Sequence, residues 1–177
     1  MKLSDSNLLN PNFYQVPAKI LAKKLLGKVL CITTPEKVFS AEILETEAYL
    51  SKDDPACHAF RGLTPRNHPM FEAGGISYVY FIYGMHYCFN VVSGKKGEGE
   101  AVLIRSVRID GEIVKGPGCV TKRLGIGPQH NGLSLQSPLF CIRDGGLEYR
   151  RSQILTTPRI GISKAKHLLL RYVVDVL

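Results

Sequence analysis

The sequence predicts an α+β fold on an antiparallel, strongly curved sheet, and three observations point to it. Short segments rich in β-branched and aromatic residues recur along the chain. Neighbouring segments are separated by turn residues, as in antiparallel hairpins, rather than by the long helical crossovers that parallel strands need. Few segments carry a helical pattern. Because no repeat, low-complexity tract or linker divides the chain, we expect residues 1–177 to form one domain.

The first expected element is an amphipathic helix over residues 17–26. Its apolar residues recur at helical spacing, with lysines between them. Pro17 suits the first helical turn, and Gly27 suits the position just past the end. Two segments of β-forming residues follow at 29–33 and 38–46, with a proline-containing turn between them. We therefore expect two neighbouring antiparallel strands after the helix.

The chain changes character over residues 50–75, where proline, glycine, aspartate and asparagine are frequent. This composition predicts a long irregular segment, and loops of this length inside a compact domain tend to be functional. Residues 76–83 then alternate in the manner of a strand, and Gly84 marks a turn. The remaining expected elements are strands at 87–93, 101–107, 139–143 and 154–156 and a short helix at 116–124.

Composition limits the class of protein. The chain is 45% hydrophobic and 21% charged, which is ordinary for a globular protein. No apolar run reaches the roughly 18–20 residues that a membrane span needs, and the first residues lack a signal-peptide pattern. We therefore expect an intracellular protein with no membrane partner. The five cysteines are widely spaced and never form Cys-x-x-Cys, which argues against a disulfide framework.

Positive charge is concentrated in the last third of the chain. Residues 1–114 carry 13 Lys and Arg against 12 Asp and Glu, whereas residues 115–177 carry 10 against 3. A basic segment of this kind points to a polyanionic partner, most commonly nucleic acid. Solubility alone would explain the same charge equally well.

Two carboxylates lie where the second expected strand enters the irregular segment, in the sequence Glu45-Thr46-Glu47-Ala48-Tyr49. The period of a strand places Glu45 and Glu47 on the same face, where apolar residues would be usual. A carboxylate in such a position could act as a general base for water. A solvated strand edge explains the pattern too, and the pattern alone favours that simpler interpretation.

Aromatic side chains gather in the same region, since five of the eight tyrosines fall between residues 49 and 87. Aromatic rings can stack on an extruded base at about 1–3 kcal/mol per base. Strand tyrosines also simply pack a sheet, and for Tyr78 we favour that explanation. Cys57, His58 and His68 share one loop, but their spacing completes no paired ligand set, so we expect no metal site.

Longer stretches of the chain resemble the alkyladenine (3-methyladenine) DNA glycosylase family, in that family's order and spacing. They are Glu45-Thr46-Glu47-Ala48-Tyr49-Leu50, Thr64-Pro65-Arg66-Asn67, Tyr78-Val79-Tyr80-Phe81-Ile82-Tyr83-Gly84-Met85 and Val102-Leu103-Ile104-Arg105. Shorter matches are Leu25-Leu26-Gly27-Lys28, Gly116-Pro117-Gly118 and Pro158-Arg159-Ile160-Gly161-Ile162. The resemblance covers most of the chain and implies a single compact α+β domain with a protruding β-hairpin that enters the DNA minor groove.

The resemblance also implies a pocket for a flipped base. Tyr49 and His58 match rings that line one side of the base, and Tyr80 matches the ring stacked on the other side. Asn90 matches the residue that disfavours normal guanine by crowding its exocyclic amine. Leu103 matches a residue of the pocket wall.

Further matches concern the reaction and the DNA. Glu47 matches the carboxylate that activates the attacking water, and Arg105 matches a residue near that water and the DNA backbone. Tyr83, at the hairpin tip, matches the side chain that fills the gap in the duplex, and Met85 is the next candidate for that role.

The function implied is that of a monofunctional DNA glycosylase in base excision repair. It would flip alkylated or deaminated purines (the class of 3-methyladenine, 7-methylguanine, hypoxanthine and ethenoadenine) out of double-stranded DNA and hydrolyse the N-glycosidic bond. We expect no cofactor and a monomer. The alternative is a non-catalytic nucleic-acid-binding module on the same fold. Two departures from the family pattern are Cys119, where a lysine is usual, and Leu169-Leu170-Arg171-Tyr172, where many members have Pro-Trp-Arg-Phe.

Overall fold

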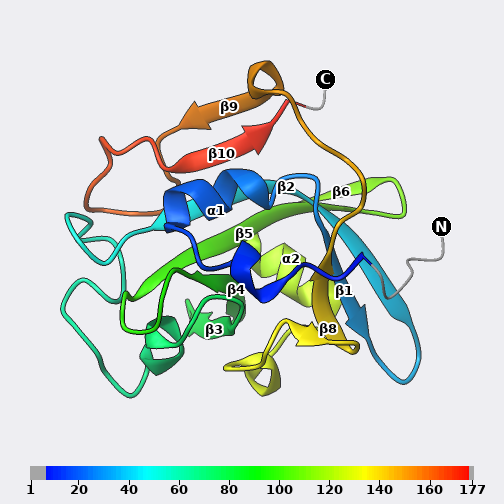
Figure 1. Ribbon diagram of the computed structural model, residues 1–177, viewed down its shortest axis with the longest axis horizontal. Coiled ribbons are helices and arrows are strands. Elements are labelled where there is room, and N and C mark those ends of the chain that lie inside the picture. The colour runs from blue at the N-terminus through cyan, green and yellow to red at the C-terminus, as the bar shows by residue number, and fades with distance from the viewer. Residues whose placement is uncertain (1–6, 176–177) are drawn as a thin grey trace.

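The computed structural model describes residues 7–175 and shows two helices and a curled antiparallel sheet of ten strands within that range (Figure 1). The expected α+β class on a curved antiparallel sheet is confirmed. The helices are α1 (Ala18–Lys24) and α2 (Pro117–Leu124). The strands are β1 (Val29–Thr33), β2 (Val38–Tyr49), β3 (Ser77–Ile82), β4 (His86–Ser93), β5 (Glu100–Ile109), β6 (Glu112–Lys115), β7 (Gln136–Ser137), β8 (Phe140–Arg143), β9 (Ile154–Thr157) and β10 (Arg171–Val174).

The two longest strands, β2 and β5, pair along the middle of the sheet (Figure 1). The other edge of β2 is shared, because its first half pairs with β1 and its second half with β10. The other edge of β5 is shared in the same way between β4 and β6. The sheet therefore divides at both ends of this central pair, which lets it curl around the core.

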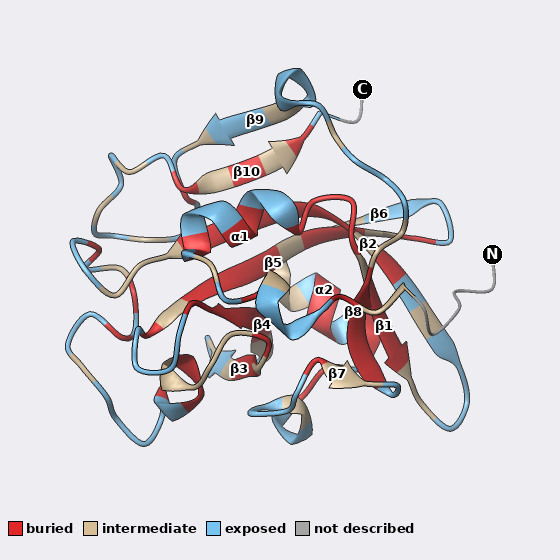
Figure 2. Ribbon diagram, in the orientation of Figure 1, coloured by how far each residue is buried: buried red, intermediate tan, exposed pale blue. Residues whose placement is uncertain are grey.

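Strand alternation separates the two faces of the central strands. Ala48, Val102 and Ile104 enter the main hydrophobic core together with Leu21 of α1. Thr46, on the same face, donates a hydrogen bond from its hydroxyl to the Ala22 carbonyl at 2.8 Å. Figure 2 shows that this central part of the sheet is largely buried. The opposite face of the same strands is therefore the one available for a site.

Helix α1 is confirmed but is shorter than the expected 17–26, because it begins after Pro17 and ends at Lys24. Pro17 supplies no side-chain cap, and Glu100 of β5 replaces it by accepting a hydrogen bond from the Ala18 N–H at 2.7 Å. Gly27 follows the helix with a φ of 81°, and a Cβ there would lie 2.7 Å from the Leu147 carbonyl oxygen. A side chain at position 27 is therefore excluded both by backbone conformation and by space.

The structure differs from the sequence-based expectation at several elements. Strand β2 continues to Tyr49, three residues beyond the end expected at Thr46, and strands β6, β7 and β10 were not expected. The irregular segment 50–75 is confirmed, with a 3-10 turn at His68–Phe71 inside it. Within the described residues, the structure contains no helix long and apolar enough to cross a membrane.

Candidate active site

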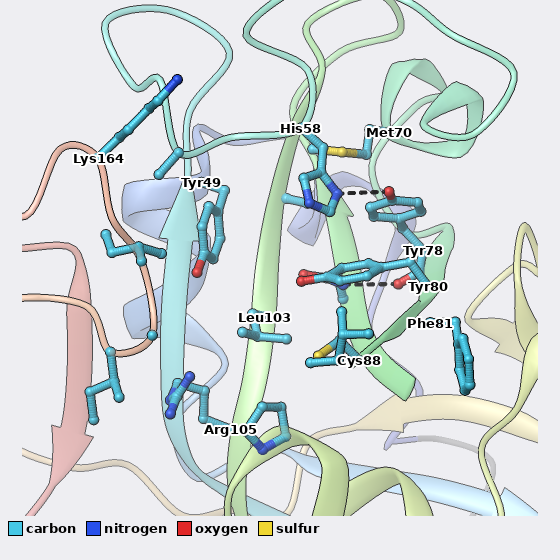
Figure 3. Close-up of a pocket in the computed structure, with 18 of the residues that line it drawn as sticks. Tyr49, His58, Met70, Tyr78, Tyr80, Phe81, Cys88, Leu103, Arg105 and Lys164 are labelled. Atoms are coloured by element: carbon cyan, nitrogen blue, oxygen red, sulfur yellow. Dashed lines mark hydrogen bonds between the residues drawn. The ribbon is translucent and has the colours of Figure 1, made fainter. Parts of the chain in front are cut away.

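A cavity of about 740 Å³ opens on the face of the sheet opposite α1. Its floor consists of side chains from β3, β4 and β5, and its walls come from the 55–58 loop and from residues 160–164. Figure 3 shows Tyr49 facing His58 and Tyr80 across this space, with Leu103 between them and Arg105 at one end. The volume lies in the range of small-molecule binding pockets.

One row of paired residues crosses five strands beneath the cavity. Tyr78 pairs with Asn90, Asn90 with Leu103, Leu103 with Glu47, and Glu47 with Arg171. Residues in register on one face lie about 5 Å apart. The sheet therefore brings together side chains that are more than ninety positions apart in the sequence.

The Glu47 carboxylate lies directly behind the cavity wall and has no exposed surface. The Tyr49 hydroxyl donates to Oε2 at 2.9 Å, and the Ile160 backbone N–H donates to Oε1 at 2.8 Å. Arg105 Nη1 reaches Oε2 at 3.5 Å. Burial raises the pKa of Glu47 above its usual value, while Arg105 and the Ile160 N–H act in the opposite direction. The solvated strand edge that the pattern alone favoured is therefore wrong for Glu47.

Arg105 sits at an irregularity of the central strand pair. Glu45 pairs with Ser106 and Thr46 with Ile104, so that Arg105 has no register partner on β2. Its Nε lies 3.1 Å from Glu45 Oε1 and 3.5 Å from Glu47 Oε1. Bulges of this kind re-aim side chains next to functional sites. Here the bulge turns one guanidinium toward two carboxylates.

Glu45 holds a second arginine as well. Arg171 Nε of β10 donates to the same Oε1 atom at 2.6 Å, and its Nη1 donates to Thr157 at 3.0 Å. The buried carboxylates of Glu45 and Glu47 therefore lie next to the guanidinium groups of Arg105 and Arg171. The positive charges of the arginines compensate a pair of carboxylates that would otherwise repel each other.

The aromatic rings form the sides of the cavity. The His58 and Tyr80 rings meet edge to face with centroids 4.6 Å apart, and His58 Nδ1 lies 2.9 Å from the Tyr78 hydroxyl (Figure 3). Tyr49 lies across the space from both, so in this structure His58 groups with Tyr80. Tyr78 itself is buried and packs in the sheet, as expected, with its ring 5.2 Å from that of Tyr80.

These rings carry no charge near neutral pH. Burial, followed by the neighbouring positive charge of Arg66, lowers the pKa of His58 below its usual value. Burial also raises the pKa of Tyr78 to about 12 and that of Tyr49 well above its usual range. The cavity therefore presents neutral, electron-rich ring faces beside the buried carboxylate of Glu47.

Asn90 and Leu103 occupy the floor. Asn90 is almost fully buried and donates from Nδ2 to the Tyr78 carbonyl at 3.0 Å, which fixes the orientation of its amide. Cys88 lies two residues before it on β4, beside Tyr80, and burial raises the pKa of that thiol to about 11. The floor thus presents a neutral thiol, a fixed amide and an aliphatic group.

The β3–β4 hairpin carries the two residues expected at its tip. Tyr83 is 81% exposed and Met85 is 69% exposed, although both side chains are large and apolar. Tyr83 has a φ of 50° and Gly84 a φ of 67°, so the turn uses two residues in the left-handed region. Behind the tip, Phe81 packs on Tyr87 at 5.0 Å between ring centroids.

Three residues at the site were not singled out from the sequence for a role. Asp54 and Arg159 form a fully buried ion pair, and Ile160 follows Arg159 and donates to Glu47. Arg159 and Ile160 belong to one of the stretches that carried the family resemblance, which was the available signal. Asp54 lies in the irregular segment, where residue pattern gave no indication. Among residues 7–175, no cluster of three metal-ligating side chains is found.

Comparison with known proteins shows the family to which the chain belongs. A family described as methylpurine-DNA glycosylase matches residues 12–176. A relative from Wolbachia of Brugia malayi (strain TRS) is 44% identical over 95% of this chain and 98% of its own length. Relatives from Myxococcus xanthus and Chlorobaculum tepidum are each 42% identical, over 90% and 92% of this chain and 84% and 85% of their own lengths. All three are provisionally named 3-methyladenine DNA glycosylases. The chain therefore belongs to the methylpurine-DNA glycosylase family of N-glycosyl hydrolases that act on DNA.

Proposed function

We propose that this enzyme flips alkylated and deaminated purines out of duplex DNA and hydrolyses their N-glycosidic bond with Glu47 as the base for water. One observation carries the proposal: a buried carboxylate lies directly behind the wall of a ring-lined cavity that one nucleoside could enter. A base inside a duplex cannot present its glycosidic bond, so it must be extruded at a cost of a few kcal/mol.

The hydrogen bonds of Glu47 leave one acceptor position of its carboxylate unused. A carboxylate offers about four acceptor positions. The Tyr49 hydroxyl, the Ile160 N–H and Arg105 occupy three of them, and these three residues also line the cavity. A water bound at the fourth position would lie against Arg105 and the sugar of an extruded nucleotide. Glu47 would take its proton, while the negative charge stabilises the developing oxocarbenium ion.

Ring chemistry supports the substrate class. Alkylation at N3 or N7 gives a purine a positive charge, which makes it a good leaving group and favours stacking on neutral, electron-rich rings. Tyr49 on one side and Tyr80 with His58 on the other provide such faces. Asn90, whose amide is held by the Tyr78 carbonyl, would crowd the exocyclic amine of normal guanine. Hypoxanthine and ethenoadenine have no such amine at that position, whereas 7-methylguanine keeps it and differs from guanine by its positive charge.

A substitution of Glu47 tests the mechanism. Glu47→Gln keeps the size of the side chain but removes the base, and we expect lesion-DNA affinity to be retained. The single-turnover excision rate should fall at least about a hundredfold, or roughly 2.7 kcal/mol of barrier. The substrates are duplexes with one 7-methylguanine, hypoxanthine or ethenoadenine, followed by alkali cleavage of abasic sites.

Glu42→Gln is the matched control, because Glu42 lies on the same strand and pairs with Arg108 at 2.7 Å, away from the cavity. It should excise at the wild-type rate. A Glu47→Gln enzyme with normal excision would refute the mechanism. A wild-type protein that binds each lesion without producing abasic sites would favour the alternative, a non-catalytic binding module.

A further inference from the structure

Asp54 and Arg159 form an ion pair from which water is fully excluded. Both side chains have no exposed surface, and two parallel bonds of 2.6 Å join the guanidinium to the carboxylate. Asp54 also accepts the Leu50 N–H at 3.1 Å and the Ala56 N–H at 3.2 Å. All four acceptor positions of the carboxylate are therefore used. The pair joins the loop after β2 to the segment before β10.

Arg159 contacts the site from the protein interior, behind the Tyr49 ring. Its Nη1 also donates to the Ala48 carbonyl at 3.0 Å, and its Cζ lies over the Tyr49 ring, 4.6 Å from the centroid. Tyr49 lines the cavity, whereas Arg159 neither lines it nor reaches solvent. The guanidinium therefore stacks on the ring face turned away from the cavity. The next residue, Ile160, donates its N–H to Glu47.

We infer that Asp54 and Arg159 are positioning residues for the hydrolysis, which fix the Tyr49 ring and the Ile160 N–H against Glu47. This inference rests on the proposed role of Glu47 as the base. Neither residue reaches the cavity, so each would act through Tyr49 and Ile160. Because Tyr49 and Ile160 hold one oxygen each, the pair determines the position of both carboxylate oxygens.

Stability alone does not account for this pair. Buried ion pairs are costly to desolvate, and well-packed apolar side chains often serve stability as well or better. Arg159 Nε is moreover buried without a hydrogen-bond partner in the described structure, which adds to the cost. An apolar residue could fill the same space, but it could not bind the Ala48 carbonyl and Asp54 while stacking on Tyr49. The fork geometry of arginine meets these three requirements together.

The test measures single-turnover excision of a paired lesion as a function of pH. Asp54→Asn should retain lesion-DNA affinity but lower the rate constant at least about tenfold, because small misplacements of reacting groups are costly. Its acidic limb should also move to higher pH. The Ile160 N–H lowers the pKa of Glu47, so loosening this hydrogen bond raises that pKa further. The other groups that face the carboxylate are Arg105, Glu45, Tyr49 and Arg159. Neither Asp54→Asn nor Arg159→Lys removes the first three. Arg159→Lys keeps the positive charge but loses the two-donor geometry of the guanidinium group. It should also lower the rate constant and move the acidic limb to higher pH.

A purely structural role gives a different result. Misfolded enzyme would reduce the amplitude of the single-turnover reaction but leave its rate constant and pH limb unchanged. Asp144→Asn is the control, because it breaks the ion pair with Lys28 at 3.0 Å, outside the cavity lining. Unchanged rate constants and pH limbs in both site variants would overturn the inference, as would failure of both to fold. Normal excision by Glu47→Gln would instead overturn the proposed function.

Discussion

The first prediction is that Tyr83 stabilises the extruded base of the proposed mechanism. The ring is 81% exposed at the hairpin tip, so little of its surface is covered in the free protein. If it inserts into the gap left by the base, roughly 100 Å² of apolar surface becomes buried at about 25 cal/mol per Å², or about 2.5 kcal/mol. This figure agrees with the roughly 1–3 kcal/mol of ring–base stacking. Tyr83→Ser should therefore lower the flipping equilibrium about 5–150-fold.

The assay follows the fluorescence of a single ethenoadenine, which rises when the base leaves the stack and does not depend on bond cleavage. The deficit of Tyr83→Ser should be largest for a well-paired lesion, because more pairing energy must be offset, and smallest for a mismatch or single-stranded DNA. Leu155→Ser is the matched control, since Leu155 is a 50% exposed apolar residue on β9. Surface substitutions of this kind change stability by less than about 0.5 kcal/mol.

Equal flipping by Tyr83→Ser and wild type on a paired lesion would show that the wedge lies elsewhere. Met85, which is 69% exposed two residues further on, is then the next side chain to substitute. A loss that is the same for paired and single-stranded lesions would also refute the reasoning, because a wedge has no gap to fill in single-stranded DNA.

Two further predictions concern charge. Lys164 lines the cavity, so Lys164→Ala should reduce the salt dependence of DNA affinity by about one unit in log–log slope, as measured by fluorescence anisotropy over a salt series; an unchanged slope would exclude contact with phosphate. The Gly146 N–H and then Lys28 hold the pKa of Asp144 below its usual value, so its contribution to stability is present at neutral pH and lost as pH falls through the folded-state pKa. Urea unfolding of Asp144→Asn should therefore show a deficit at pH 7 that disappears in acid.

The strand pattern was sufficient to predict most of the sheet. Alternation and turn residues located β1, β3, β4 and β5 within one or two residues, because each carries a continuous run of β-formers. Strand β10 was missed because four residues are too few to give a clear periodic signal in the sequence. The early end predicted for β2 has a related cause: the continuation through Glu47 to Tyr49 depends on pairing with β10 and β5, which are distant in the sequence.

Some features of the site could likewise be predicted from local sequence, whereas others depend on contacts between distant segments. The strand pattern pointed to the two carboxylates of β2 but favoured a solvent-exposed position for them. This was wrong for Glu47 because the segment around Ile160, which is distant in the sequence, packs over it. The resemblance had named several residues that line the cavity, among them Tyr49, Tyr80 and Leu103. Neither the residue pattern nor the resemblance indicated the Asp54–Arg159 pair. The two residues are 105 positions apart, and their ion pair is not part of a local helix, strand or turn. Such a contact becomes visible only when the fold brings the two segments together.

The burial of Glu47 implies a conflict between stability and reactivity that can be measured. Its pKa is raised in the folded protein, so the native state loses stability as pH rises from the usual glutamate pKa through the folded-state value, where the carboxylate must ionise without water. Glu47→Gln removes that charge and should unfold at a higher temperature than wild type at pH 8. The two proteins should converge near pH 4, where Glu47 is protonated. Each kcal/mol gained raises the Tm of a chain this size by about 2–4 °C. A Glu47→Gln protein that is less stable than wild type by the same amount at both pH values would show that Arg105, Tyr49 and the Ile160 N–H fully compensate the buried charge. In that case burial could not be what maintains the reactivity of this carboxylate.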